Sequence, residues 1–347
     1  MTAATDVAST STAHRSTLRP LTSLVNFLLS IKPLANFAKS RARQMMIDRA
    51  EQIGVYWRQE AAFLQAQNLD ALRQQVENSA LVYPDYYLTS FHAYDEGNLG
   101  WLPATELEVA ARAVHAKIWP EAKAQGDRAL RDSFLDVVDR RIDPAQHPMT
   151  AIVDLGCGVG LSSFRMRDRY PDAQITGLDL SAYFLAVAMY RDTERHATQA
   201  TQTAQAVPTP LTHATATQPN AIRWIHAAAE ATTLDDQCCD LVTLFLVCHE
   251  LPGDASCEIF REARRLLRPG GHLAIMDMNP QSEIYGKMPP YVFTLLKSTE
   301  PYLDSYFNLD IGQALIEAGF NAPTIDYNSP RHRTVIARAP ETAHNHQ

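Results

Sequence analysis

The sequence has little basic charge, few cysteines and no apolar run long enough to cross a bilayer. Its 347 residues include 31 Lys and Arg against 39 Asp and Glu, a formal net charge of -8. This acidic balance argues against a dedicated nucleic-acid surface. The five cysteines have no paired spacing suited to zinc, and no secretory segment precedes them. We therefore expect no disulfide, no metal and a reducing, cytoplasmic location.

An apolar stretch near the N-terminus has helical spacing over residues 18–37 and is broken at Lys32 and Pro33. It is too short to span a membrane. Basic residues follow it up to Arg49, and an apolar helix with basic neighbours is typical of segments that lie on a membrane surface. Residues 18–49 are thus expected either to contact a membrane peripherally or to pack on the protein. Residues 1–16 and 341–347 are expected to be tails.

A glycine-rich turn lies near the middle of the chain. Residues 152–163 read as a buried strand, a turn with Gly156, Gly158 and Gly160, and the start of an amphipathic helix. Glycine suits such a turn because it accepts positive φ and leaves room for a ligand against the backbone. A dinucleotide fingerprint needs a third small residue where Leu161 stands. This turn therefore fits a nicotinamide-dependent oxidoreductase less well than it fits other nucleotide-binding α/β proteins.

Further strands follow in an alternating α/β pattern. They are expected over residues 174–179, 222–226, 240–247 and 272–277, with a closing hairpin over 323–337. Asp179 ends the second strand, where a carboxylate can bind the two ribose hydroxyls of a nucleoside. His249 and Glu250 follow the fourth strand, at the edge where open α/β sheets hold ligands. His249 is expected either to act as a general base oriented by Glu250 or only to line the pocket.

The G-x-G-x-G turn resembles motif I of the class I S-adenosylmethionine-dependent methyltransferases. The tract 240–277, with its R-x-L-x-P-G-G turn, resembles the ubiquinone- and menaquinone-type (type 11) small-molecule enzymes. The resemblance covers roughly residues 150–338. It implies a Rossmann-like seven-stranded mixed sheet of order 3-2-1-4-5-7-6, S-adenosylmethionine as cofactor, and C-, O- or N-methylation of a small, lipophilic acceptor. A catalytically silent binding module is the alternative.

The same resemblance implies a set of cofactor contacts. Asp154 is expected to act through the loop on the amino group of the cofactor, and Ala229 and Glu230 are expected to flank the adenine. Cys157 is expected to be a small packing residue of the loop and no nucleophile. The full set of expected cofactor-binding residues is Asp154, Gly156, Cys157, Gly158, Gly160, Asp179, Leu180, Ala229, Glu230 and Leu246.

The remaining segments are expected to surround this domain, which we place at residues 146–340. A helical region over 17–145 precedes it and is expected to cap the substrate. Its aromatic segment 83–101 is expected to cover the cofactor pocket, with His92 and Tyr94 as catalytic candidates, or else to serve as a packing strip. Residues 196–219, nearly all Ala, Thr, Gln and Pro, are expected to form a flexible loop. Residues 288–302 are expected to form a lid. The oligomeric state stays open.

Overall fold

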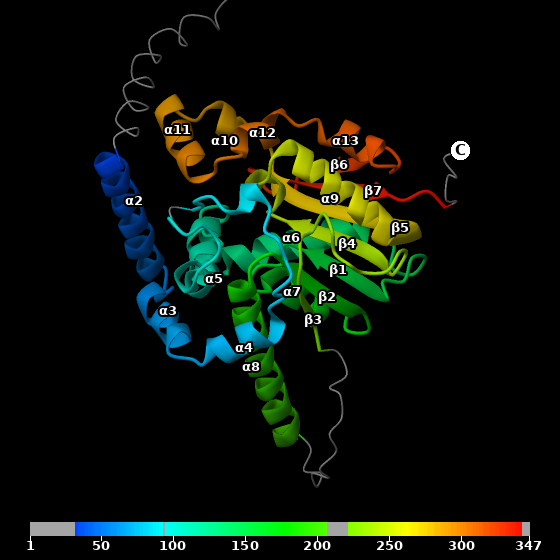
Figure 1. The fold of residues 1–347 in the computed structure, drawn as a ribbon, viewed down its shortest axis with the longest axis horizontal. Coiled ribbons are helices and arrows are strands. Elements are labelled where there is room, and N and C mark those ends of the chain that lie inside the picture. The colour runs from blue at the N-terminus through cyan, green and yellow to red at the C-terminus, as the bar shows by residue number, and fades with distance from the viewer. Residues whose placement is uncertain (1–31, 93, 207–220, 342–347) are drawn as a thin grey trace, which may run out of the picture.

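A seven-stranded sheet forms the centre of the computed structural model, which describes residues 32–92, 94–206 and 221–341 (Figure 1). The strand order is β3-β2-β1-β4-β5-β7-β6, as expected. β7 runs antiparallel to both of its neighbours, and the other described pairs are parallel. The strands are β1 (Ala151–Leu155), β2 (Gln174–Asp179), β3 (Arg223–His226), β4 (Cys239–Phe245), β5 (Leu267–Met278), β6 (Thr324–Asp326) and β7 (His332–Arg338).

Helices cover both faces of the sheet and extend to one side of it (Figure 1). Those before β1 are α2 (Lys32–Gln52), α3 (Trp57–Gln65), α4 (Leu69–Val76), η1 (Asp85–Tyr87), α5 (Trp101–His115), η2 (Pro120–Gln125) and α6 (Gly126–Arg141). Those after it are α7 (Leu161–Arg169), α8 (Ala182–Ala206), η3 (Cys248–Glu250), α9 (Gly253–Leu266), α10 (Glu283–Gly286), α11 (Pro290–Thr299), α12 (Leu303–Asn308) and α13 (Ile311–Glu317).

Successive side chains of the central strands enter two separate cores, because side chains alternate between the faces of a sheet. Val242 and Leu244 of β4 pack with α9, α12 and α13 on one face. Leu241 and Phe245 of the same strand pack with α6 and α7 on the other. Both faces are thus apolar, which explains why the strands read as continuous hydrophobic runs in the sequence.

Two of the expected boundaries differ from the structure. Helix α6 was assigned to the N-terminal region, but its Leu130 and Phe134 belong to the same core as Ile152 of β1. The α/β unit therefore begins before residue 146. Helix α8 continues to Ala206, so residues 196–206 are helical where we expected a loop. The apolar periodicity of α8 ends earlier than its backbone, which is why the sequence pattern missed this extension. Residues 207–219 lie outside the described residues.

The N-terminal helices pack on one another and on the α/β unit. Ile47 and Ala50 of α2 share a small core with Trp57 of α3 and Val109 of α5. A second core joins Leu64, Leu69 and Ala104 of this region to Val159 and to Phe184 and Val187 of α8. In the part of the chain that the structure describes, no helix is long and apolar enough to cross a membrane. The expected tails 1–16 and 342–347 and the apolar residues 18–31 lie outside that part.

Residues 78–100, which connect α4 to α5, lie along the edge of the sheet where the parallel strands end. We call them the cover segment; Figure 1 shows it in cyan. The amide of Asn78 donates to Nδ1 of His226 at the end of β3 (2.9 Å), and the amide of His92 donates to the carbonyl oxygen of Thr299 at the end of α11 (3.0 Å). Between them, Ser181 donates to the carbonyl oxygen of Asn98 (2.7 Å). The cover segment therefore spans the sheet edge from β3 to α11.

We predict that Gly97→Ala destabilises the cover segment. Gly97 has φ of 59°, and a Cβ there would overlap the carbonyl oxygen of Thr89. Strain of this kind costs about 1–3 kcal/mol. Chemical denaturation should show a loss of that size, while the matched control Gly286→Ala, whose Cβ meets nothing within 4 Å, should leave stability unchanged. Equal stability of the two variants would contradict this account of the segment.

Candidate cofactor and acceptor site

The glycine turn after β1 is shaped by three positive φ angles, at Gly156 (69°), Gly158 (56°) and Gly160 (83°). The amides of Gly156 and Cys157 both donate to the carbonyl oxygen of Leu178 in β2 (2.8 and 3.0 Å). Gly160 is the N-cap of α7, so the helix begins at Leu161 as expected. The turn is tightly surrounded, because a Cβ on Gly156 would lie 2.7 Å from Cγ2 of Val247. Glycine is therefore required by both conformation and space.

Asp179 connects this turn to the end of β2. Its Oδ2 accepts from the amide of Gly158, and its Oδ1 accepts from the amide of Ser181, each at 2.8 Å. The helix cap is made by Ser181, whose Oγ accepts from the amide of Phe184. Burial raises the pKa of the Asp179 carboxyl to about 6 against the lowering effect of those two amides. A carboxylate has about four acceptor positions, so this one can also accept from two ribose hydroxyls.

Asp154 lies behind the glycine turn, so its expected action on the amino group of the cofactor could only be indirect and stays a prediction. Its side chain is fully buried, with Ser162 and Ser163 of α7 donating to its Oδ2 (2.7 and 2.6 Å) and Thr243 of β4 donating to its Oδ1 (2.8 Å). Three hydroxyl donors hold this carboxylate between β1, β4 and α7. Asp154 therefore orients the first turn of the helix behind the glycine turn. The sequence did contain a signal for this role, namely two serines at the start of the helix.

The expected adenine side of the site is covered in this structure. Tyr87 packs with Leu180 and Ala228 in one small core, and all three are buried. Tyr86 donates to Oε1 of Glu230 (2.8 Å), while Oε2 of Glu230 is buried and has no hydrogen-bond partner among the described residues. Ala229 is also buried. The residues expected at the adenine thus lie together, and Tyr86 and Tyr87 of the cover segment pack against this group.

Leu246 and Val247 turn the chain from β4 into η3. Leu246 has φ of 59° and donates its amide to the carbonyl oxygen of Met276 (2.8 Å). Its side chain packs toward the core beneath α6 and α7. The neighbouring Val247 lies against Gly156 instead. Sequence reasoning chose Leu246 and missed Val247, because a one-residue change of position reverses the side on which a side chain lies.

His249 follows β4 on the same edge, and its hydrogen-bond partner is not the expected Glu250. Its Nδ1 lies 2.8 Å from Oδ1 of Asp277, the last acidic residue of β5. Glu250 lies instead beside His92 and Asn98. Burial disfavours the imidazolium, but the Asp277 carboxylate outweighs burial and raises the pKa of His249 to about 10. A ring that keeps its proton at neutral pH donates hydrogen bonds and accepts a proton only after losing its own.

His92 joins this group from the cover segment. Its Nε2 lies 3.3 Å from Oε1 of Glu250 and 3.2 Å from Oε1 of Glu300. Burial raises the pKa of both carboxyls. We call His92, His249, Glu250 and Glu300 the edge cluster. Sequence reasoning found the first three and missed Glu300, which follows a helix and has no neighbouring motif to identify it.

Tyr94 is not part of the edge cluster. Its hydroxyl donates to Oε2 of Glu106 in α5 (2.7 Å), and Arg43 of α2 pairs with the same carboxylate. Burial and the adjacent Glu106 raise the pKa of Tyr94. This side chain therefore joins the cover segment to α5 and α2, which corresponds to the packing alternative for this part of the segment.

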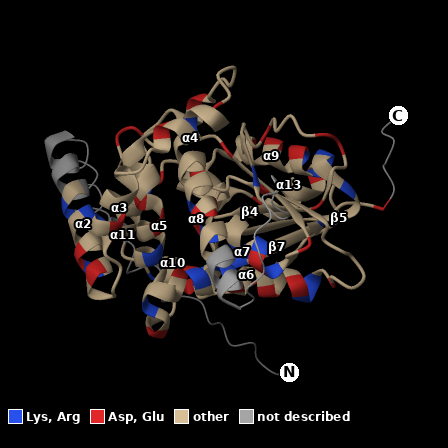
Figure 2. Ribbon diagram, turned by 90° about the horizontal axis from the view of Figure 1, so that it is seen from below, with Lys and Arg blue, Asp and Glu red and all other residues tan. Residues whose placement is uncertain are grey.

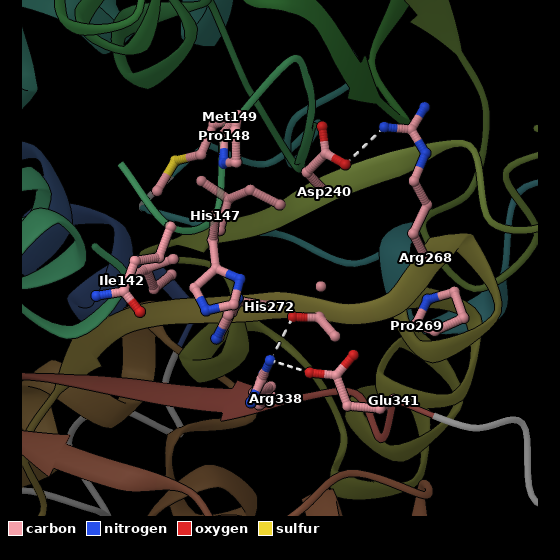
Figure 3. A pocket seen from close by; sticks show the side chains of 14 residues that line it. Ile142, His147, Pro148, Met149, Asp240, Arg268, Pro269, His272, Arg338 and Glu341 are labelled. Carbon is pink, nitrogen blue, oxygen red and sulfur yellow. Dashed lines mark hydrogen bonds and ion pairs between the residues drawn. The ribbon is translucent and has the colours of Figure 1, made fainter. Parts of the chain in front are cut away.

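A separate hollow of about 210 Å³ lies at the opposite edge of the sheet, where β1, β4 and β5 begin (Figure 3). Ion pairs join Arg268 to Asp240 (2.5 Å) and Arg338 to Glu341 on its walls. The rings of His147 and His272 lie 5.6 Å apart there. Its charged side chains are thus already paired with one another, and none of the expected site residues lines it.

The comparisons with known proteins agree with this geometry. Residues 153–275 match a family model described as "Methyltransferase domain". A malonyl-[acyl-carrier protein] O-methyltransferase of Methylovorus sp. (strain MP688) is 24% identical over 218 residues, which are 59% of this chain and 60% of that protein. The chain thus covers less than two thirds of that relative's length.

Solved structures with similar coordinates include a putative O-methyltransferase of Nostoc punctiforme (TM-score 0.47, 15% identity, 82% of this chain and 73% of that chain). Another is phosphoethanolamine N-methyltransferase 2 of Haemonchus contortus in complex with S-adenosyl-L-methionine (TM-score 0.43, 14% identity, 60% of this chain and 52% of that chain). The family match and the strand order together show that the chain carries a class I S-adenosylmethionine-dependent methyltransferase domain of type 11.

Proposed function

We propose that the whole chain transfers the methyl group of S-adenosylmethionine to a small molecule whose reacting atom lies at the edge cluster. The observation that carries the proposal is the position of two groups on one sheet edge. The glycine turn with Asp179 follows β1 and β2, and His249 with Glu250 follows β4. Since β4 pairs directly with β1, the two groups are neighbours. A donor methyl at the turn would therefore face an acceptor at the cluster.

The chemistry asks little else of the protein. The sulfonium methyl is already activated, so catalysis depends on aligning donor and acceptor and on excluding water. The cover segment supplies the exclusion, since Phe91 is buried and Tyr86 and Phe91 lie near Tyr302 with ring centroids 6.5 and 6.2 Å apart. These rings also suit a lipophilic acceptor.

The charge of the edge cluster limits which chemical class of acceptor can bind there. Two carboxylates, Glu250 and Glu300, stand beside His92, and Asp277 stands behind His249. Burial raises the pKa of both glutamates, but whichever of them is ionised would repel an anionic acceptor, such as the malonyl group in the name of the Methylovorus relative. We therefore propose a neutral acceptor that offers a hydroxyl or an amine.

The reducing, cytoplasmic location expected from the cysteines also stays a prediction.

The first test is cofactor binding. By titration calorimetry, S-adenosylmethionine should bind the full chain, and Gly158→Asp should abolish binding by adding a side chain at φ of 56°. Asp179→Ala should weaken it by about 1–3 kcal/mol through lost hydrogen bonds. Because the protonated Asp179 carboxyl accepts poorly, affinity should fall below about pH 6, the pKa that burial sets beside Glu250 and Asp154. The Asp179→Ala variant should lose that pH dependence.

Gly286→Ala serves as the control, because this glycine lies on α10 away from the turn. Circular dichroism should confirm that all variants are folded. Tight binding of NADH with no response to S-adenosylmethionine would contradict the proposal and favour the oxidoreductase interpretation.

The second test concerns His249. With an acceptor identified by mass spectrometry of co-purified ligands, His249→Ala should lower kcat by roughly 10²–10⁴. Asp277→Asn should lower kcat less, since it leaves the ring in place but weakens the contact that orients it. The affinity for S-adenosylmethionine should stay unchanged in both variants. An unchanged kcat would make His249 a pocket-lining residue, and cofactor binding without any methyl transfer would favour a silent module.

The third test concerns membranes, for which residues 18–49 remain the proposed contact. In the described part of this segment, Arg43 pairs with Glu106, and α2 carries acidic as well as basic side chains (Figure 2). If the segment binds anionic lipid, the protein should float with anionic liposomes at low salt and be released at high salt. A variant with Lys39 and Arg41 changed to Gln should float less. Equal recovery with and without liposomes would leave only the packing role.

A further inference from the structure

The edge cluster brings donor atoms of two types to one point from three separate elements. His92 comes from the cover segment, His249 and Glu250 come from η3, and Glu300 follows α11. One donor atom each of His92, His249 and Glu250 lies within 4.8 Å of the others. Nδ1 of His249 is already engaged by Asp277, so Nε2 is the atom that would face an ion, and ion binding would release its proton.

The distances around His92 have the spacing of ligands on one ion. Its Nε2 lies 3.3 Å from Oε1 of Glu250 and 3.2 Å from Oε1 of Glu300. Two ligand atoms each held about 2.0–2.1 Å from a tetrahedral ion stand about 3.4 Å apart. The ring of His249 would have to move closer to the donor atoms of His92 and Glu250 when an ion binds. Its contact with Asp277 reproduces the carboxylate–histidine pair that commonly orients a metal-bound imidazole.

The hydrogen bonding of the edge cluster is incomplete. Oε2 of Glu300 is buried and has no hydrogen-bond partner among the described residues, although the side chain is only 9% exposed. Oε2 of Glu250 has only a long contact of 3.4 Å with Asn98. Buried carboxylate oxygens without partners are costly, and a cation is the ligand that would compensate them.

We propose that His92, His249, Glu250 and Glu300 bind one divalent ion of the zinc class on the acceptor side of the site. Two imidazoles with two carboxylates suit a borderline transition-metal ion better than Mg²⁺, which prefers oxygen ligands and keeps its waters. This inference differs from the expectation of no metal, which rested on the lack of cysteine spacing suited to a zinc site built from thiolates.

Ion binding stands independently of turnover, whereas its role rests on the proposed function. A bound divalent ion would orient an acceptor oxygen beside the donor methyl and would favour loss of the proton from that oxygen. Of the two acceptor groups proposed above, the ion thus favours a hydroxyl. The pairing of β4 with β1 would keep that oxygen next to the glycine turn.

The test uses the full chain without a histidine tag and Zn²⁺ alone as probe. Calorimetry should show one ion per chain, and Mg²⁺ should bind far more weakly. His92→Ala and the nearly isosteric Glu300→Gln should each weaken Zn²⁺ binding at least tenfold, and Asp277→Asn should weaken it by roughly 10–100-fold. X-ray absorption should show nitrogen and oxygen ligands without sulfur.

His147→Ala is the matched control, because His147 is a partly exposed histidine at the opposite edge of the sheet (Figure 3). It should bind Zn²⁺ like the unaltered chain. Binding that is unaffected by both His92→Ala and Glu300→Gln, or that is lost in His147→Ala, would overturn the proposal. S-adenosylmethionine titrations on the same samples separate the two ideas, since failure of Zn²⁺ binding with intact cofactor binding removes the ion alone.

Discussion

The carboxylate of Asp179 is the group on which the arrangement of the site depends. It receives the amide of Gly158 from the turn after β1 and the amide of Ser181 from the start of α8, so one side chain sets the relative position of two loops. Both loops lie at the carboxyl edge of a parallel sheet, where the ends of β1, β2 and β4 are neighbours. A buried carboxylate is costly unless it is hydrogen-bonded, and here the two amides both stabilise it and hold the turn ready for a ligand.

The N-terminal half of the chain also contributes side chains to this edge of the sheet. In the cover segment, Asn78 is hydrogen-bonded to His226 and Asn98 to Ser181, and His92 lies beside Glu250. Leu107 of α5 comes close to the turn as well, since its Cδ2 would lie 3.1 Å from a Cβ on Gly158. The α/β unit alone would leave this edge open to water. The helical region therefore covers this edge of the sheet, and one of its small cores attaches it to α8.

The fold was predictable because it depends on local patterns, and the residues proposed for the cofactor belong to the same patterns. Gly156, Gly158 and Gly160 have positive φ, as glycines at this spacing after a strand predict. Apolar runs that end in Asp179 or His249 mark strands whose ends meet at one edge. Asp277, Glu300 and Val247 were missed because their roles depend on which strands pair and on where a helix ends. The orientation of Asp154 was not predictable for a related reason. A carboxylate near a glycine turn can face the ligand or the helix, and only the positions of Ser162, Ser163 and Thr243 decide between them.

Tyr87 shows what the closed edge requires of the molecule. It packs against Leu180, one of the expected cofactor contacts, and against Ala228, which precedes the Ala229 and Glu230 that the family resemblance places at the adenine ring. A ligand that contacts both residues must therefore move Tyr87 or take its place. An adenine ring placed there would cover apolar surface that the tyrosine ring now covers. The unpaired Oε2 of Glu230 would at the same time come within reach of a polar ligand. Cofactor binding at this place would therefore be coupled to the position of Tyr87, because the two rings would compete for one apolar surface.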